Sequence, residues 1–164
     1  MTLKVTEYPC FKEKGILILK KFLEEPDGWI EDKLNSCLVL SCCYQAMGEN
    51  AAAFDILFYS FTMDVPRAEI CCEIGRLFME KREYVTAAYW YQQALLAPRK
   101  KKNGGFYIAD SHDFIPAIQM CVCLDKAGRH REAFEFHKKV RVLKPLHQAV
   151  IGNEKYFRDV WGME

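Results

Sequence analysis

The amino-acid sequence predicts an all-α protein made of antiparallel helix pairs. Two stretches, which start at Leu34 and Ala68, align with each other at a spacing of 34 residues, and a third stretch from Phe114 repeats their pattern. Helix–turn–helix units that recur at such a period bury their apolar faces by stacking on one another. Equivalent positions of the three stretches hold similar residues. One position is always small, at Ser41, Gly75 and Cys121, and another is always alanine, at Ala53, Ala87 and Ala133. Between them, Gly48, Arg82 and Gly128 occupy the expected turn.

The period and these positions are typical of tetratricopeptide (TPR) repeats. We therefore expect a TPR-type α-solenoid of antiparallel helix pairs. One domain is expected to span 1–164, with repeats at 34–67, 68–98 and 114–147. In such a stack each repeat contacts only its neighbours, and the array usually serves as a binding surface.

Helices are also expected on both sides of the three repeats. Pro9 suits the first position of a helix over 9–25, and apolar residues from Ile16 to Leu23 recur at helical spacing. Because no partner helix precedes this one in the chain, we interpret it as the second half of an incomplete repeat. At the other end, residues 148–160 are expected to form a helix that caps the stack.

Each repeat is expected to divide into two helices at a short turn. Gly48 and Gly128 can take a positive φ at the end of a helix without steric cost. Arg82 occupies the same position in the second repeat and cannot adopt this conformation as cheaply. The second turn is therefore expected to differ in detail from the other two.

Residues 99–113 interrupt the alignment between the second and third repeats and are expected to form an inserted loop. Its cations could attract an acidic partner, and its aromatic rings could stack on a sugar or a side chain. The alternative is that the cations are merely solvated and the rings pack against the repeats. A metal site is disfavoured, because a few donors on one flexible loop make a weak cage. The candidate ligand-binding residues of the loop are Lys101, Phe106, Tyr107 and Asp110.

Charge and hydropathy exclude several function classes. Lys and Arg number 23 and Asp and Glu 22, so no overall field would recruit nucleic acid or an anionic membrane. The longest apolar run among the first 30 residues, 16–19, is too short for a signal peptide or a membrane helix. We therefore expect a cytoplasmic protein.

The eight cysteines include no CxxC motif. Neighbours such as Cys42 and Cys43 point in different directions on a helix, so they cannot easily share a metal ion or a bridge. We interpret the cysteines as reduced, small apolar filler, with zinc or a disulfide as the alternative. Neither a metal ion nor a cofactor is expected.

The first helices of the repeats are expected to line a groove, as in other TPR stacks. The chemistry of this groove is mixed and rather apolar, which favours an extended or helical segment of protein as its ligand. For its central cation, Arg76, the alternative is a pairing with Glu69, Glu73 or Glu80 on the same helix. The candidate partner-binding residues are Asn35, Leu38, Gln45, Glu69, Arg76, Met79, Ile118 and Asp125.

Four motifs are more specific than the repeat pattern. They are GWIEDK at 28–33, PRAEICCEIGR at 66–76, AYWY at 88–91 and FIPAIQMCVC at 114–123. Together these motifs resemble the C-terminal TPR region of bacterial glycosyltransferases that carry an N-terminal catalytic domain dependent on a nucleotide sugar.

The resemblance implies a non-catalytic tail that binds a protein or peptide segment, such as an adjoining glycosyltransferase domain or its acceptor. The acidic motif of that catalytic domain has no counterpart in the sequence. No catalytic residue is therefore carried over, and this chain is expected not to be an enzyme. Two alternatives stay open, an acceptor-recognition part of a glycosyltransferase and a module that forms a homodimer through the unpaired N-terminal helix.

Overall fold

The computed structural model describes residues 9–99 and 108–163, with side chains from Glu13 onward. All regular structure in these residues is helical and comprises eight α-helices and two short 3₁₀-helices, which confirms the all-α class. Within this part of the chain, no helix combines the length and apolar character that a bilayer-spanning segment requires. The described residues form two compact units, one of 9–66 and the other of 67–99 with 108–163.

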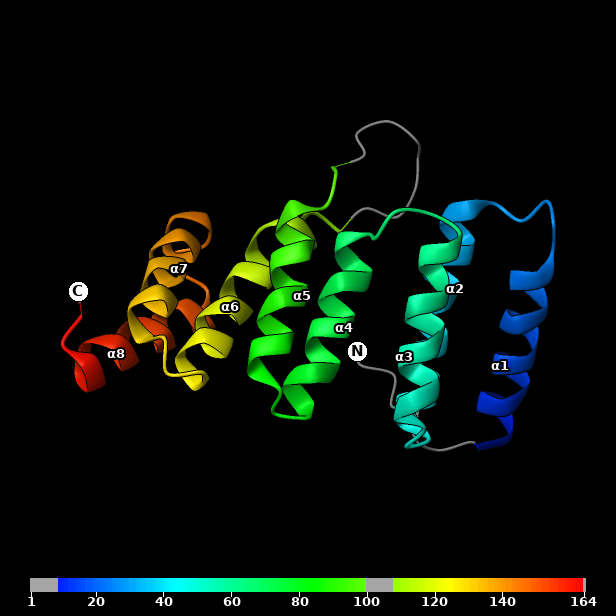
Figure 1. Ribbon diagram of the computed structural model, residues 1–164, viewed down its shortest axis with the longest axis horizontal. Helices are drawn as coiled ribbons and strands as arrows, with labels where there is room; N and C mark the ends of the chain where they lie inside the picture. Colours follow the sequence, from blue (N-terminus) through cyan, green and yellow to red (C-terminus); the bar gives the residue numbers. More distant parts are fainter. Residues whose placement is uncertain (1–8, 100–107, 164) are drawn as a thin grey trace. The chain divides into compact units, whose positions relative to one another are not determined.

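The first unit is built around its second helix, which packs against the helices before and after it. Acidic residues in the first turn of this helix, Glu31 and Asp32, interact favourably with the helix dipole. The helix begins at Ile30, before the expected start of the first repeat at 34. The elements of the unit are α1 (Pro9–Glu24), α2 (Ile30–Ala46), α3 (Asn50–Tyr59) and the 3₁₀-helix η2 (Ser60–Thr62) (Figure 1).

The second unit contains two helix pairs and a terminal helix. Its elements are α4 (Ala68–Glu80), α5 (Tyr84–Leu96), the 3₁₀-helix η3 (Ala109–His112), α6 (Phe114–Lys126), α7 (His130–Leu143) and α8 (Gln148–Trp161) (Figure 1). The helices α4 and α5 pack together, as do α6 and α7, and α5 packs against α6, so the two pairs stack on each other. The helix α8 packs on α7, and its buried side chains Val150 and Phe157 join the core of the unit.

Three helix pairs, α2/α3, α4/α5 and α6/α7, are joined by turns with the same backbone geometry. Their turn residues have φ angles of 79° at Gly48, 60° at Arg82 and 77° at Gly128. The next residue in each turn donates its backbone N–H to a carbonyl oxygen at the end of the preceding helix, as in a Schellman motif. These bonds are Glu49 to Tyr44 at 2.9 Å, Glu83 to Phe78 at 2.9 Å and Arg129 to Leu124 at 2.8 Å.

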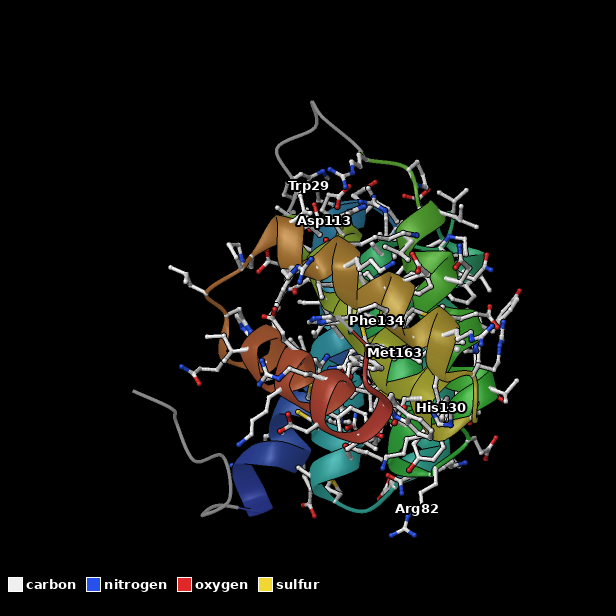
Figure 2. The ribbon with its side chains drawn as sticks, turned by 90° about the vertical axis from the view of Figure 1, so that its left-hand side faces the viewer. Trp29, Arg82, Asp113, His130, Phe134 and Met163 are labelled. Carbon is white, nitrogen blue, oxygen red and sulfur yellow. The ribbon has the colours of Figure 1, made fainter. Side chains whose placement is uncertain are left out.

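The expectation that the second turn would differ is therefore wrong. Arg82 adopts the left-handed conformation that glycine adopts in the other two turns. Its side chain is exposed and projects away from the helices (Figure 2), so no steric contact with another element opposes this conformation. The remaining cost is that of the left-handed backbone itself, about 1–2 kcal/mol for a residue with a Cβ atom.

Small residues lie where the helices of each pair approach each other. Ala53, Ala87 and Ala133, which follow the three turns, are each 0 % exposed. Gly75 on α4 faces the ring of Tyr91 on α5 so closely that an added Cβ atom would lie 3.0 Å from the ring. The aligned small residues thus set how closely the two helices of a pair can pack.

Candidate functional site

The central cation of the predicted groove is engaged on its own helix. The guanidinium of Arg76 donates to both oxygens of Glu73, at 2.9 Å from Nε and 2.6 Å from Nη2. Its Nη1 also pairs with Glu80, one turn further along α4. The structure therefore favours the alternative interpretation, in which Arg76 belongs to an ion-pair series along α4.

Two other predicted groove residues on α4 also make contacts within the unit. A carboxylate oxygen of Glu69 accepts the backbone N–H of Ile108 at 3.0 Å and lies 3.8 Å from Nε2 of the buried His112. The sulfur of Met79 lies 3.4 Å from the hydroxyl of Tyr91, which donates to it. Glu69 thus holds the segment that leads into η3.

The predicted groove residues on α6 are covered by neighbouring helices. Ile118 is buried in a core cluster to which α8 contributes Val150. Asp125 accepts from the hydroxyl of Tyr156 on α8 at 2.8 Å, and its other oxygen lies 2.7 Å from Nδ1 of His130. These two positions therefore attach α8 to the unit.

The remaining predicted groove residues lie on α2, in the first unit. Asn35 is exposed and Leu38 is half-buried. The side-chain amide of Gln45 donates to the hydroxyl of Ser41 at 3.1 Å. The eight predicted residues thus belong to two units, and five of them lie in the second.

Of the four candidate residues in the inserted loop, Lys101, Phe106 and Tyr107 lie outside the described residues. Asp110 lies in η3, and its carboxylate pairs with the ammonium of Lys144 after α7. In the described ranges, no group of three or more His, Cys, Asp or Glu side chains gathers in a way that could hold a metal ion.

The seven cysteines whose side chains are described are all free. Five of them, including Cys71 and Cys123, are buried in the helix cores. Burial raises the pKa of Cys37 to about 11 and the pKa values of Cys71 and Cys123 to about 12. These thiols stay protonated at neutral pH, which suits small packing residues and makes them poor nucleophiles.

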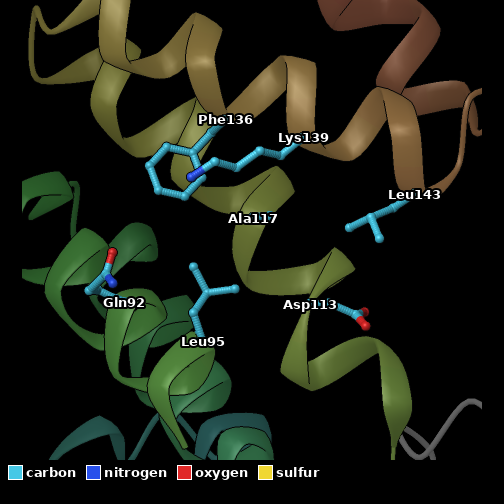
Figure 3. Close-up of a pocket in the computed structure, with 7 residues that line it drawn as sticks. All are labelled: Gln92, Leu95, Asp113, Ala117, Phe136, Lys139 and Leu143. Carbon is cyan, nitrogen blue, oxygen red and sulfur yellow. The ribbon is translucent and has the colours of Figure 1, made fainter.

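A pocket that the sequence did not reveal lies among α5, α6 and α7 (Figure 3). It has a volume of about 330 Å³. Leu95 and Phe136 face each other across it and pack against a buried cluster that includes Ala117 of α6. The complete lining is Gln92, Leu95, Asp113, Ala117, Phe136, Lys139 and Leu143.

The charged groups of the pocket differ in how far they are neutralised. Asp113 caps α6, where one carboxylate oxygen accepts the N–H of Phe114 at 2.6 Å, and its other oxygen lies 3.3 Å from the guanidinium of Arg99. The ammonium of Lys139 lies 4.5 Å from the centre of the Phe136 ring. The pocket therefore has an apolar interior with a cation over one wall and a neutralised carboxylate at the edge of α6.

Periodicity could have indicated the two walls of this pocket. Phe136, Lys139 and Leu143 recur at helical spacing and share one face of α7, and Gln92 and Leu95 share a face of α5. The hollow itself depends on the small side chain of Ala117 between them, which only the packing of three helices reveals.

The sequence was compared with models of known protein families and with curated proteins, and neither comparison finds a match.

Proposed function

We propose that this chain is a protein-interaction scaffold of the TPR type, in which stacked helix pairs present a binding surface to a segment of another protein. The observation that carries this proposal is one structural unit that recurs three times. Each copy has a left-handed turn residue, the same N–H to carbonyl bond across the turn, and a fully buried alanine in the next helix. Arrays of such pairs commonly bind extended or helical protein segments.

The distribution of contacts in the second unit supports a binding role for its pocket over the predicted groove. Arg76, Glu69 and Asp125 are bound to other residues of the unit. The pocket among α5, α6 and α7 offers an apolar concave surface with a few polar groups, which is the usual character of a binding site.

The proposal is tested by selecting random linear peptides on the immobilised full chain from a display library. We expect a family of related peptides whose synthetic members bind saturably and 1:1 in calorimetry. Heat-unfolded chain serves as the control for adsorption to unfolded polypeptide. If no related family is enriched, or if the unfolded chain retains the same peptides, the scaffold proposal is wrong.

The motifs at 28–33, 66–76, 88–91 and 114–123 resemble those of glycosyltransferase tails, and this resemblance suggests a narrower form of the proposal, in which the bound segment belongs to a catalytic domain or its acceptor. In either form, the chain itself carries out no sugar transfer. Incubation of the chain with a panel of nucleotide sugars should release no nucleoside diphosphate above the level in buffer. Release that grows with protein concentration would contradict this part of the proposal.

Self-association through α1 is a second candidate function, and a specific observation favours it. Leu17 and Ile18 on this helix are 55 % and 65 % exposed. Exposed apolar pairs on a helix can form a small contact between two copies. Sedimentation should then show a dimer whose population rises with concentration and falls in the double variant Leu17→Lys/Ile18→Lys. Val85→Lys, which removes an exposed apolar side chain from α5, is the control.

A further inference from the structure

We propose that the pocket among α5, α6 and α7 binds a partner segment that presents one large apolar side chain beside a carboxylate. This inference rests on the proposed scaffold function and names the class of ligand that one surface of the scaffold would take. It follows from the size of the pocket, the nature of its walls and the state of its charged groups.

The size and walls of the pocket suit a single apolar anchor. Its volume of about 330 Å³ lies at the lower end of the range for ligand pockets, roughly 300–1,000 Å³. Leu95, Phe136 and Leu143 form apolar walls of the pocket. The small side chain of Ala117 leaves space between these walls (Figure 3). The pocket has room for one leucine or phenylalanine side chain from a partner and for part of the chain that carries it, and such anchors lie at the centre of many interfaces.

Lys139 gives the pocket its preference for a carboxylate. Its neighbours on α7 are paired, since Lys138 lies 2.7 Å from Glu135 and Arg141 lies 3.3 Å from Glu154. Among the described residues, no carboxylate lies within ion-pair distance of Lys139, and its ammonium is held over the Phe136 ring. This cation is therefore available to a carboxylate that arrives with the ligand.

The carboxylate of Asp113 does not cancel this preference. It accepts the N–H of Phe114 and pairs with Arg99 at 3.3 Å, so its charge is offset before any ligand arrives. Lys139, Arg99 and Asp113 together carry a net charge of +1, which disfavours a basic segment. Gln92, on the opposite wall from Lys139, offers a side-chain amide to the backbone of the bound segment.

The test uses fluorescein-labelled peptides in a Gly/Ser background that carry Phe-Glu, Phe-Lys or Ala-Glu at their centre. Fluorescence anisotropy with the full chain should show the tightest binding for Phe-Glu. We expect Phe-Lys to bind about fivefold more weakly, because one partly exposed ion pair is lost, and Ala-Glu to show no saturable binding.

Two variants on the surface of α7 locate the effect. Lys139→Glu should reverse the preference, so that Phe-Lys binds more tightly than Phe-Glu. Lys138→Glu changes the same charge one residue away and should leave the preference unchanged. Both residues are exposed, and thermal unfolding of each variant checks that the fold is intact.

The outcomes separate this inference from the scaffold proposal. If the peptides do not bind, or if Lys139→Glu leaves their order of affinity unchanged, the inference about the pocket is wrong. The peptides enriched by display could instead bind Lys139→Glu as tightly as they bind the unaltered chain. This result would mean that they bind another surface of the chain, and the scaffold proposal would stand. A display selection that yields no family would instead remove the scaffold proposal.

Discussion

The imidazole of His130 stacks on the indole of Trp161, with ring centres 3.7 Å apart. His130 is the first residue of α7 and Trp161 is the last residue of α8, so the stack joins the start of α7 to the end of α8. Hydrogen bonds reinforce it, because the indole N–H of Trp161 donates to Tyr156 at 3.3 Å and Tyr156 donates to Asp125 at 2.8 Å. The C-terminal helix is therefore attached to both α6 and α7.

Trp161→Ala should loosen this attachment. Loss of the stack and of the hydrogen bond to Tyr156 should lower the free energy of unfolding by about 1–2 kcal/mol, since Trp161 is only partly buried. Backbone amides of α8 should exchange with solvent faster than those of α6, as measured by hydrogen exchange. Trp29→Ala is the matched control, because Trp29 is 46 % exposed against 40 % for Trp161 and lies in the other unit. Equal effects of the two substitutions on α8 exchange would contradict the prediction.

The buried imidazole of His137 should cost stability at neutral pH. This side chain is 0 % exposed and packs beside the rings of Phe134 and Phe157. Neither of its ring nitrogens has a hydrogen-bond partner among the described residues. His137→Leu, which copies the residue at the equivalent position of the first repeat, Leu57, should raise the free energy of unfolding by about 1 kcal/mol at pH 7.5. Urea denaturation measures the change, and a loss of stability would contradict the prediction.

The same substitution should weaken the acid sensitivity of the fold. Burial has the largest effect on the pKa of His137 and lowers it. Glu154 raises this pKa by a smaller amount, and Arg141 lowers it further. Below about pH 6.5 the unfolded chain takes up a proton at this ring while the folded chain keeps it neutral, so stability falls with falling pH until the folded pKa is passed. Between pH 7.5 and pH 5.5, His137→Leu should therefore lose less stability than the unaltered chain, as urea denaturation at the two pH values would measure. An unchanged slope would show that other groups control the acid response.

The sequence predicted the helical class and the positions of helix pairs because these depend on local and periodic chemistry. The alignment places Ala53, Ala87 and Ala133 in one column, and all three are buried where helices meet. The helices α4 and α6 begin at Ala68 and Phe114, the residues from which the second and third aligned stretches start. A small residue that recurs at one position of each repeat predicts a close helix contact there, even when the partner helix is unknown.

The candidate site was harder to predict because its chemistry depends on which neighbours each side chain finds. Arg76 was the natural choice for a ligand-binding cation, and the sequence could not decide whether Glu73 and Glu80 neutralise it. Conversely, Lys139 lies in a run of basic residues, and such a run predicts a helix surface that is exposed to solvent. Only the packing of both α5 and α7 against α6 places Leu95 across from Phe136 and forms the pocket.

The left-handed residue in the second turn offers a test of the repeat geometry. Arg82→Gly should raise the free energy of unfolding by up to about 1 kcal/mol, because it removes a strained φ of 60° while adding some entropy to the unfolded chain. Gly128→Ala should lower it by about 1 kcal/mol, since no atom lies within 4 Å of the added Cβ and the cost is that of the backbone alone. Chemical denaturation measures both values, and changes of the same sign would contradict a shared turn geometry.

Two glycines in helices of the second unit should respond in opposite directions to the same substitution. In Gly152→Ala on α8, the added Cβ meets nothing within 4 Å, so the higher helix propensity of alanine should raise the free energy of unfolding by about 0.5–1 kcal/mol. In Gly75→Ala on α4, the added Cβ would lie 3.0–3.1 Å from three ring atoms of Tyr91.

The ring of Tyr91 cannot move away easily, because it is 1 % exposed and its hydroxyl is held by Met79. Overpacking of about 1–3 kcal/mol should therefore exceed the gain in helix propensity, and Gly75→Ala should lower the free energy of unfolding by about 1 kcal/mol. The double variant Gly75→Ala/Tyr91→Leu removes the ring and should recover part of this loss, which a double-mutant cycle measures. If Gly75→Ala instead stabilised the chain as much as Gly152→Ala does, α4 and α5 would not be held together by close packing at this glycine.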